Sequence, residues 1–191
     1  MKVVMLMVVT YTNFRGDLYY LHEKITKKGN TSYHFAKKST ECTVESLPDG
    51  YEIYEDPNGK VFLRKILKKV IHENEIKAIQ SAMNNVCLIQ DFKLDIKRET
   101  IYIYTVSNAL EKIEQRFPFA NSVNLDEYKN YETLLRFTLV DEKTRFFIVE
   151  RFSFLSGIED WIELDGSENL QKLAEEYVQH LGQESFYELF E

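Results

Sequence analysis

The fold is decided by residues 51–65, which read YEIYEDPNGKVFLRK. Two runs rich in apolar residues, broken by charged ones, flank a turn triplet in which Pro57 fixes its own φ and Gly59 accepts a positive φ. Looping the chain through this triplet places three favourable pairs opposite each other: Tyr54 with Phe62, Ile53 with Leu63, and Glu52 with Arg64. The segment therefore predicts a β-hairpin with a positive φ at Gly59.

A second hairpin is predicted upstream, with strands at residues 18–25 and 31–38 and a turn at residues 27–30. The apolar residues of both strands fall at odd positions: Tyr19, Leu21, Ile25, Tyr33 and Phe35. These side chains reach one core only if odd-numbered residues of the first strand lie opposite odd-numbered residues of the second. A three-residue loop with a bulge at Gly29 provides this register. His22 then faces His34 on the solvent side, together with Tyr20, Lys24 and Lys38.

The rest of the chain alternates strand and helix patterns. Helical spacing predicts a helix over residues 72–85, a second from Ser107 to about residue 117, and a third from Ser167 to about Leu181, with a short segment at 185–190. Strands are expected at 86–96, 100–106, 132–140, 145–155 and 161–164. The predicted fold class is α+β, with antiparallel hairpins, about three main helices and no internal repeat.

Basic and acidic residues are distributed unevenly along the chain. Residues 1–70 contain 12 Lys and Arg against 8 Asp and Glu, whereas residues 71–191 contain 12 against 23. We therefore predict a small basic β-hairpin module at 1–70, followed by a larger acidic α+β domain at 71–191. A surface charged only for solubility would give a similar division.

Cysteine content and hydropathy indicate a cytoplasmic protein. Cys42 and Cys87 have no partner motif, so neither a disulfide framework nor a zinc spacing is present, and a reducing compartment follows. The apolar run at residues 3–9 is too short for a membrane helix, and no small-residue cleavage site follows it, so it is interpreted as a buried strand or, alternatively, as a non-native start.

Two stretches resemble a group of uncharacterised bacterial proteins. One covers roughly residues 18–65, including GYEIYE, PNG and VFLRK, and the other covers roughly residues 149–190, including ERF, DWI and HLG. The resemblance implies a bacterial source and brings no activity, cofactor or catalytic residue with it.

Candidate catalytic and metal sites are weakly supported. His22, His34 and Cys42 lack a fourth ligand for a closed zinc site, and Cys87 lies between two apolar residues that favour packing over nucleophilic chemistry. Asp91 with Asp95 and Lys97 loosely fits a metal-dependent nuclease, but five Asp/Glu-x-Lys triplets occur in this highly charged chain. No metal site and no cofactor are predicted.

Basic residues interleaved with aromatic residues remain as the main functional signal. Lysine neutralises phosphates or carboxylates, and an exposed ring can stack on a base. The predicted binding residues are Tyr20, His22, Lys24, His34 and Lys38. The leading hypothesis is a binding protein that recognises an acidic protein partner or nucleic acid; a metal-dependent hydrolase or nuclease is the alternative, and whether the chain is an enzyme stays open.

Overall fold

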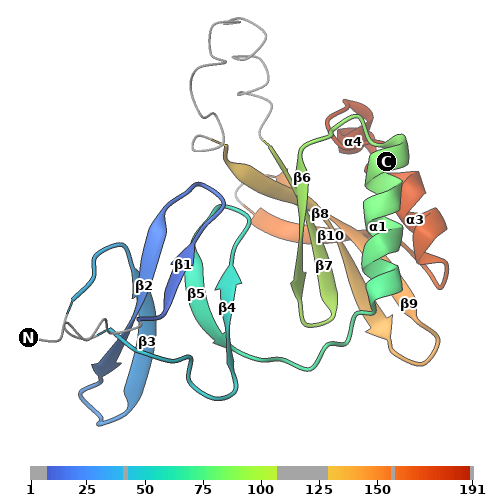
Figure 1. The fold of residues 1–191 in the computed structure, drawn as a ribbon. Helices are drawn as coiled ribbons and strands as arrows, with labels where there is room; N and C mark the ends of the chain where they lie inside the picture. Colours follow the sequence, from blue (N-terminus) through green and yellow to red (C-terminus); the bar gives the residue numbers. More distant parts are fainter. Residues whose placement is uncertain (1–7, 41–42, 107–128, 156–157, 190–191) are drawn as a thin grey trace, which may run out of the picture. The chain divides into compact units, whose positions relative to one another are not determined.

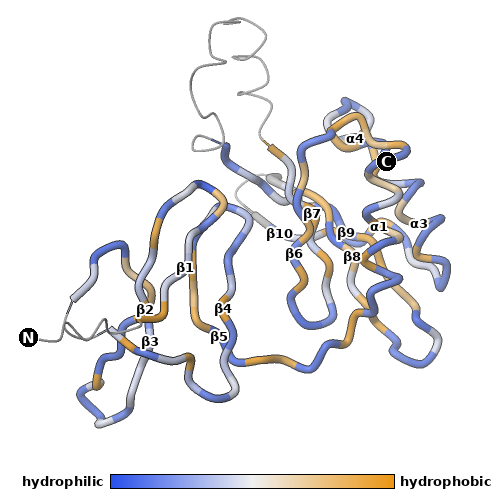
Figure 2. The backbone as a smooth tube through the Cα atoms, viewed as in Figure 1, coloured by the Kyte–Doolittle hydropathy of each residue, from blue (hydrophilic) through white to orange (hydrophobic). Residues whose placement is uncertain are grey.

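The computed structural model describes residues 8–40, 43–106, 129–155 and 158–189. This part of the chain forms three antiparallel sheets and three helices (Figure 1), which confirms the predicted α+β class. Hydrophobic residues recur along α1 (Glu73–Val86) and α3 (Leu170–Val178), as Figure 2 shows. Among the described residues, no helix is both long and apolar enough to cross a bilayer.

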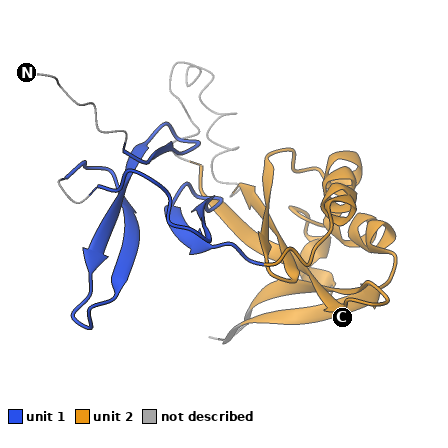
Figure 3. Cartoon of the chain, turned by 60° about the horizontal axis from the view of Figure 1, so that its bottom comes forward, with its two compact units in different colours: residues 1–67, 126–128 blue, residues 68–125, 129–191 orange. Residues whose placement is uncertain are grey.

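The described chain divides into two compact units (Figure 3), each treated separately below. Unit 1 comprises the described residues up to Leu67, and unit 2 comprises those from Lys68 onward. The assignment of basic charge to one module and acidic charge to the other stays a prediction from composition.

Unit 1 contains a three-stranded sheet and a separate hairpin. The strands β1 (Thr10–Thr12), β2 (Leu18–Ile25) and β3 (Thr31–Ala36) lie in the order β1-β2-β3, and β4 (Tyr51–Glu55) pairs with β5 (Val61–Lys65). The predicted register of both hairpins is confirmed, with Leu21 opposite Phe35 and all three pairs of the second hairpin in place. Gly59 has a φ of 80°, as its turn position requires.

Three turns of unit 1 share one construction, at residues 13–17, 26–30 and 56–60. In each turn the first N–H donates to the fifth carbonyl, and the N–H of the fourth residue, a glycine, donates to the first carbonyl. The first side chain also accepts a hydrogen bond from the fifth N–H, at 2.8, 3.1 and 2.8 Å respectively. The turn therefore repeats within unit 1, although no internal repeat is expected from the sequence.

Unit 2 is a five-stranded antiparallel sheet covered on one face by helices. The strands are β6 (Phe92–Lys97), β7 (Thr100–Val106), β8 (Tyr131–Asp141), β9 (Phe146–Leu155) and β10 (Ile158–Ser167), in the order β10-β9-β8-β7-β6. α1 and α3 lie side by side on this face, and α4 (Ser185–Glu188) follows (Figure 1). Their apolar residues, including Ile79 and Leu173, form one core with Ile101, Leu135 and Phe147 of the strands.

Most predicted elements of unit 2 are confirmed, with shifted ends. The strand expected from residue 86 begins only at Phe92, since α1 continues to Val86 and residues 87–91 have no regular secondary structure. The strand around Trp161 is longer than predicted. The last helix begins at Leu170, not near Ser167, because the side chain of Asn169 accepts the Lys172 N–H at 3.1 Å and caps it there. The helix predicted from Ser107 lies outside the described residues.

Candidate functional site

Four of the predicted binding residues lie on the β2–β3 hairpin of unit 1, and Lys38 lies two residues after the end of β3. Tyr20, His22 and Lys24 alternate along β2 and so share one face, which His34 joins from β3. The rings of His22 and His34 stack with centroids 5.4 Å apart and planes 23° apart. Lys24, His34 and Lys38 are exposed, and Tyr20 is half-buried. The structure therefore leaves four of the five predicted residues accessible.

His22 departs from the prediction because it is buried, with only 3% of its surface exposed. Its Nε2 lies 2.9 Å from the Lys38 carbonyl oxygen, and its Nδ1 lies 3.0 Å from the Thr40 hydroxyl. A carbonyl only accepts hydrogen bonds, so Nε2 is the donor to Lys38, and both ring nitrogens have a partner within the chain. The chain after β3 returns across this face to place Thr43 opposite His22. His22 is therefore a structural residue.

The end of this hairpin is a two-stranded ribbon. β1 pairs with β2 only from Leu18 to Tyr20, and Thr43 pairs with His22, so past His22 the described chain gives β2 only β3 as a pairing partner. We call residues 24–32 the free ribbon; all are exposed except Thr26, and Figure 2 shows its turn as largely hydrophilic. Ile25, expected in the core, is 73% exposed because the ribbon extends past the packed part of unit 1.

Of the lysines on and beside the free ribbon, four form no ion pair with another described residue. Lys37 is bound to Asp17 at 2.8 Å, and this hydrogen bond lowers the pKa of the Asp17 carboxyl below its usual value. Among the described residues, no ion pair involves the exposed side chains of Lys24, Lys27, Lys28 or Lys38.

The residues considered for catalysis are either buried or paired with other side chains. Cys87 is 5% exposed, and burial raises the pKa of its thiol, which disfavours the nucleophilic thiolate. Asp95 is bound to Lys97 at 3.1 Å, and Asp91 is bound to Lys129 at 2.6 Å and accepts the Tyr131 hydroxyl proton at 2.9 Å. Within the described residues, no three His, Cys, Asp or Glu side chains lie close enough together to hold a metal ion.

Unit 2 carries a cluster of charged and aromatic side chains around Arg136 that the sequence analysis did not identify. It lies on the sheet face opposite α1 and α3, because Arg136 falls between the core residues Leu135 and Phe137. Arg136 binds Glu150 through two hydrogen bonds of 2.7 and 2.6 Å, and its guanidinium lies 4.2 Å from the centroid of the Trp161 ring. Lys97 pairs with Asp95 and Arg136 pairs with Glu150, so the charges of both cations are satisfied within unit 2.

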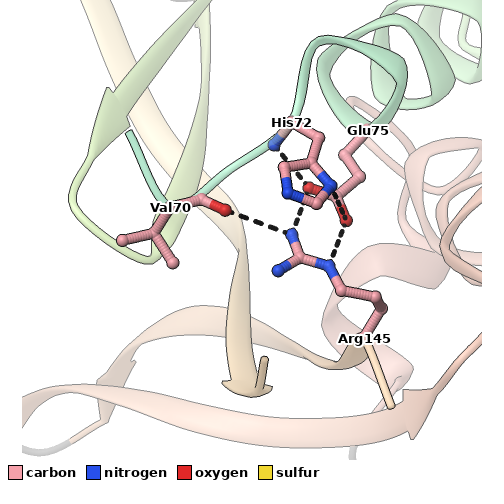
Figure 4. A network of polar contacts seen from close by, with 4 residues as sticks. All are labelled: Val70, His72, Glu75 and Arg145. Atoms are coloured by element: carbon pink, nitrogen blue, oxygen red, sulfur yellow. Dashed lines mark hydrogen bonds and ion pairs between the residues drawn. The ribbon is translucent and has the colours of Figure 1, made fainter. Parts of the chain in front are cut away.

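A second missed network joins the β8–β9 turn to the start of α1 (Figure 4). Arg145, at a φ of 57°, donates to the buried Glu75 carboxylate at 2.7 and 2.5 Å and to the Val70 carbonyl at 3.3 Å. Glu75 also accepts the backbone N–H of the N-cap residue His72 at 2.7 Å. The pair borders a groove of about 520 Å³ that the starts of α1 and α3 also line.

The sequence carries a partial signal for these two clusters. Arg136 and Glu150 stand at polar positions of alternating strands, but their pairing depends on the register across the β8–β9 turn. Arg145 lies far from Glu75 in sequence, so local patterns do not reveal their contact. The resemblance to uncharacterised bacterial proteins stays a prediction. No family model, curated protein or solved structure significantly matches this chain.

Proposed function

We propose that this chain is a non-enzymatic binding protein of the bacterial cytoplasm that recognises a polyanion through its free ribbon and adjacent residues. The observation that carries this proposal is the set of four exposed lysines that form no ion pair within the described chain: Lys24, Lys27, Lys28 and Lys38. Cations that have no carboxylate of their own protein can neutralise the phosphates or carboxylates of a partner.

The contrast with the charged cluster around Arg136 in unit 2 supports the choice of this surface. There, Lys97 and Arg136 are already bound to the carboxylates of Asp95 and Glu150. An incoming anion would have to displace these carboxylates, whereas at the free ribbon it would displace only water and counterions. The cytoplasmic location is supported by the two cysteines, which have no partner motif.

Fluorescence polarisation with labelled heparin and labelled oligonucleotides at low salt tests the proposal. Replacing Lys24→Glu and Lys38→Glu together is expected to weaken binding by about tenfold or more, because two attractive charges become repulsive. The control, Lys77→Glu with Lys172→Glu, makes the same change in net charge on exposed positions of α1 and α3. We expect this control to bind within about twofold of the unmodified protein.

Circular dichroism and urea unfolding establish that both double variants are folded. If both double variants lost affinity for the polyanion equally, only net charge would matter and the free ribbon would not be the site. Failure of every polyanion to bind the unmodified protein at micromolar concentration would overturn the proposal itself.

A further inference from the structure

We infer that the free ribbon enters the major groove of double-stranded DNA; this inference rests on the proposed function and names its partner. The B-form major groove, about 12 Å wide and about 8.5 Å deep, admits a two-stranded β-ribbon. Two residue pairs of the free ribbon, Lys24 with Ser32 and Ile25 with Thr31, precede the turn at residues 26–30. The two pairs span about 7 Å and the turn adds to this length, so the free ribbon is long enough to reach into the groove.

The side chains of the free ribbon suit the floor and walls of such a groove. Lys27 and Lys28 stand in the turn, where they can reach phosphates, and Lys24 and Ser32 face each other across the strands. Lysine, serine, threonine and asparagine hydrogen-bond base edges, and an apolar side chain such as that of Ile25 can contact a thymine methyl group. Ile25 is 73% exposed, and such a contact would bury it.

Single-stranded nucleic acid fits less well because the free ribbon contains no aromatic residue. Binding of single strands relies on aromatic rings on which bases stack. The nearest ring on β3 belongs to Tyr33, which is half-buried and packs edge-on against Tyr51 with centroids 6.0 Å apart. Duplex RNA also fits less well, since the major groove of an A-form helix is too narrow to admit side chains.

The test measures the binding of five labelled probes to the full chain: a DNA duplex of about 15 base pairs, each of its two single strands, the RNA duplex of the same sequence, and heparin. At one low salt concentration, the DNA duplex is expected to bind about tenfold tighter than either strand or the RNA duplex. Four neutralised phosphates predict a slope of about −3.6 for the logarithm of the binding constant against the logarithm of the salt concentration.

Variants and competitors locate the contact. Lys27→Glu with Lys28→Glu is expected to weaken duplex binding by about tenfold and to make the salt slope less steep by about 2. The control pair Lys77→Glu and Lys172→Glu is expected to leave both measurements unchanged. Methyl green, which occupies the major groove, should displace the protein, and netropsin, which occupies the minor groove, should not.

The outcomes separate this inference from the proposed function. Equal or tighter binding of single strands or of RNA, or displacement by netropsin alone, would overturn duplex-groove recognition and leave polyanion binding intact. If the chain bound heparin or an acidic protein but no nucleic acid, duplex-groove recognition would also be overturned and polyanion binding would remain intact. Failure of all probes, heparin included, would overturn both.

Discussion

Gly59 and Gly29 share a left-handed backbone, with φ of 80° and 79°, but differ in their surroundings. A Cβ at Gly59 would lie 3.0 Å from Asn13 Nδ2 and 3.2 Å from Phe14 Cε1, whereas one at Gly29 would meet nothing within 4 Å. Gly29→Ala should therefore cost only the backbone strain of about 1 kcal/mol, and Gly59→Ala should cost about 1 kcal/mol more. Urea unfolding of both variants gives the difference, and equal losses would contradict the close packing at Gly59.

Tyr177 gives unit 2 a sensitivity to alkaline pH. Burial, together with the neighbouring Asp165 and Glu176 carboxylates, raises its pKa to about 12. Because tyrosine in the unfolded chain titrates at about 10, the unfolded state ionises first, and this group lowers stability as the pH rises from about 10 to about 12.

Tyr177→Phe should therefore lose less stability than the unmodified protein between about pH 8 and about pH 11. Tyr187→Phe, at a side chain that is 69% exposed, is the control and should behave like the unmodified protein. Urea unfolding at both pH values measures the effect; an identical pH dependence for the Tyr177 variant would contradict it.

Arg145 combines backbone strain with a buried ion pair. Arg145→Gly should relieve about 1 kcal/mol of backbone strain at the positive φ of this residue. The same substitution leaves the Glu75 carboxylate, which is 8% exposed, without its cation, and this should cost about 3 kcal/mol. We expect a net destabilisation of about 2 kcal/mol. Adding Glu75→Gln should recover part of this loss; a purely additive double variant would show that the two side chains do not interact.

The turn after β1 holds the β4–β5 hairpin of unit 1 in place. Asn13 is buried, and its Nδ2 donates to the Gly59 carbonyl at 2.8 Å, while its Oδ1 accepts two N–H groups of its own turn. Nearby, the Tyr11 hydroxyl donates to Glu55 at 2.8 Å, a hydrogen bond that raises the pKa of Tyr11.

Asn13→Ala should destabilise unit 1 by about 2 kcal/mol or more, because it leaves a buried carbonyl and two N–H groups without partners. Asn30→Ala, at an exposed turn position, should cost less than about 1 kcal/mol. Amide hydrogen exchange in β4 and β5 shows where stability is lost. Faster exchange there in the Asn13 variant alone would place the loss in the β4–β5 hairpin. Equal protection in both variants would contradict the link between the two hairpins.

Hairpins and helices were predictable because their signals are local. The Pro57-Asn58-Gly59 triplet and the parity of apolar residues in β2 and β3 determine the register within a few residues. The burial of His22 and the exposure of Ile25 were not predictable. They depend on where Lys38, Thr40, Thr43 and β1 lie relative to β2, which no local pattern indicates. Of the binding site, the hairpin face could be predicted, and its buried histidine could not.

The division into two units predicts where the whole chain is open to proteases. Residues 66–72 lie between β5 and α1 without regular secondary structure, and Ile66 and Leu67 are 61% and 46% exposed. Brief trypsin treatment should cut after Lys65, Lys68 or Lys69 and release a fragment that retains its helices by circular dichroism. Mass spectrometry identifies the cut. Resistance of this segment while other sites are cut would indicate a single cooperative domain.

The three alike turns of unit 1 also constrain how its gene can change. Each depends on a glycine at the fourth of five positions, so gaining or losing one codon within a turn would displace that glycine and slip the strand that follows. In the β2–β3 hairpin such a slip would exchange the faces of β3, sending His34 inward and Phe35 outward. Descendants of this sequence should therefore vary at these turns by replacement of residues, with single-codon insertions and deletions removed by selection.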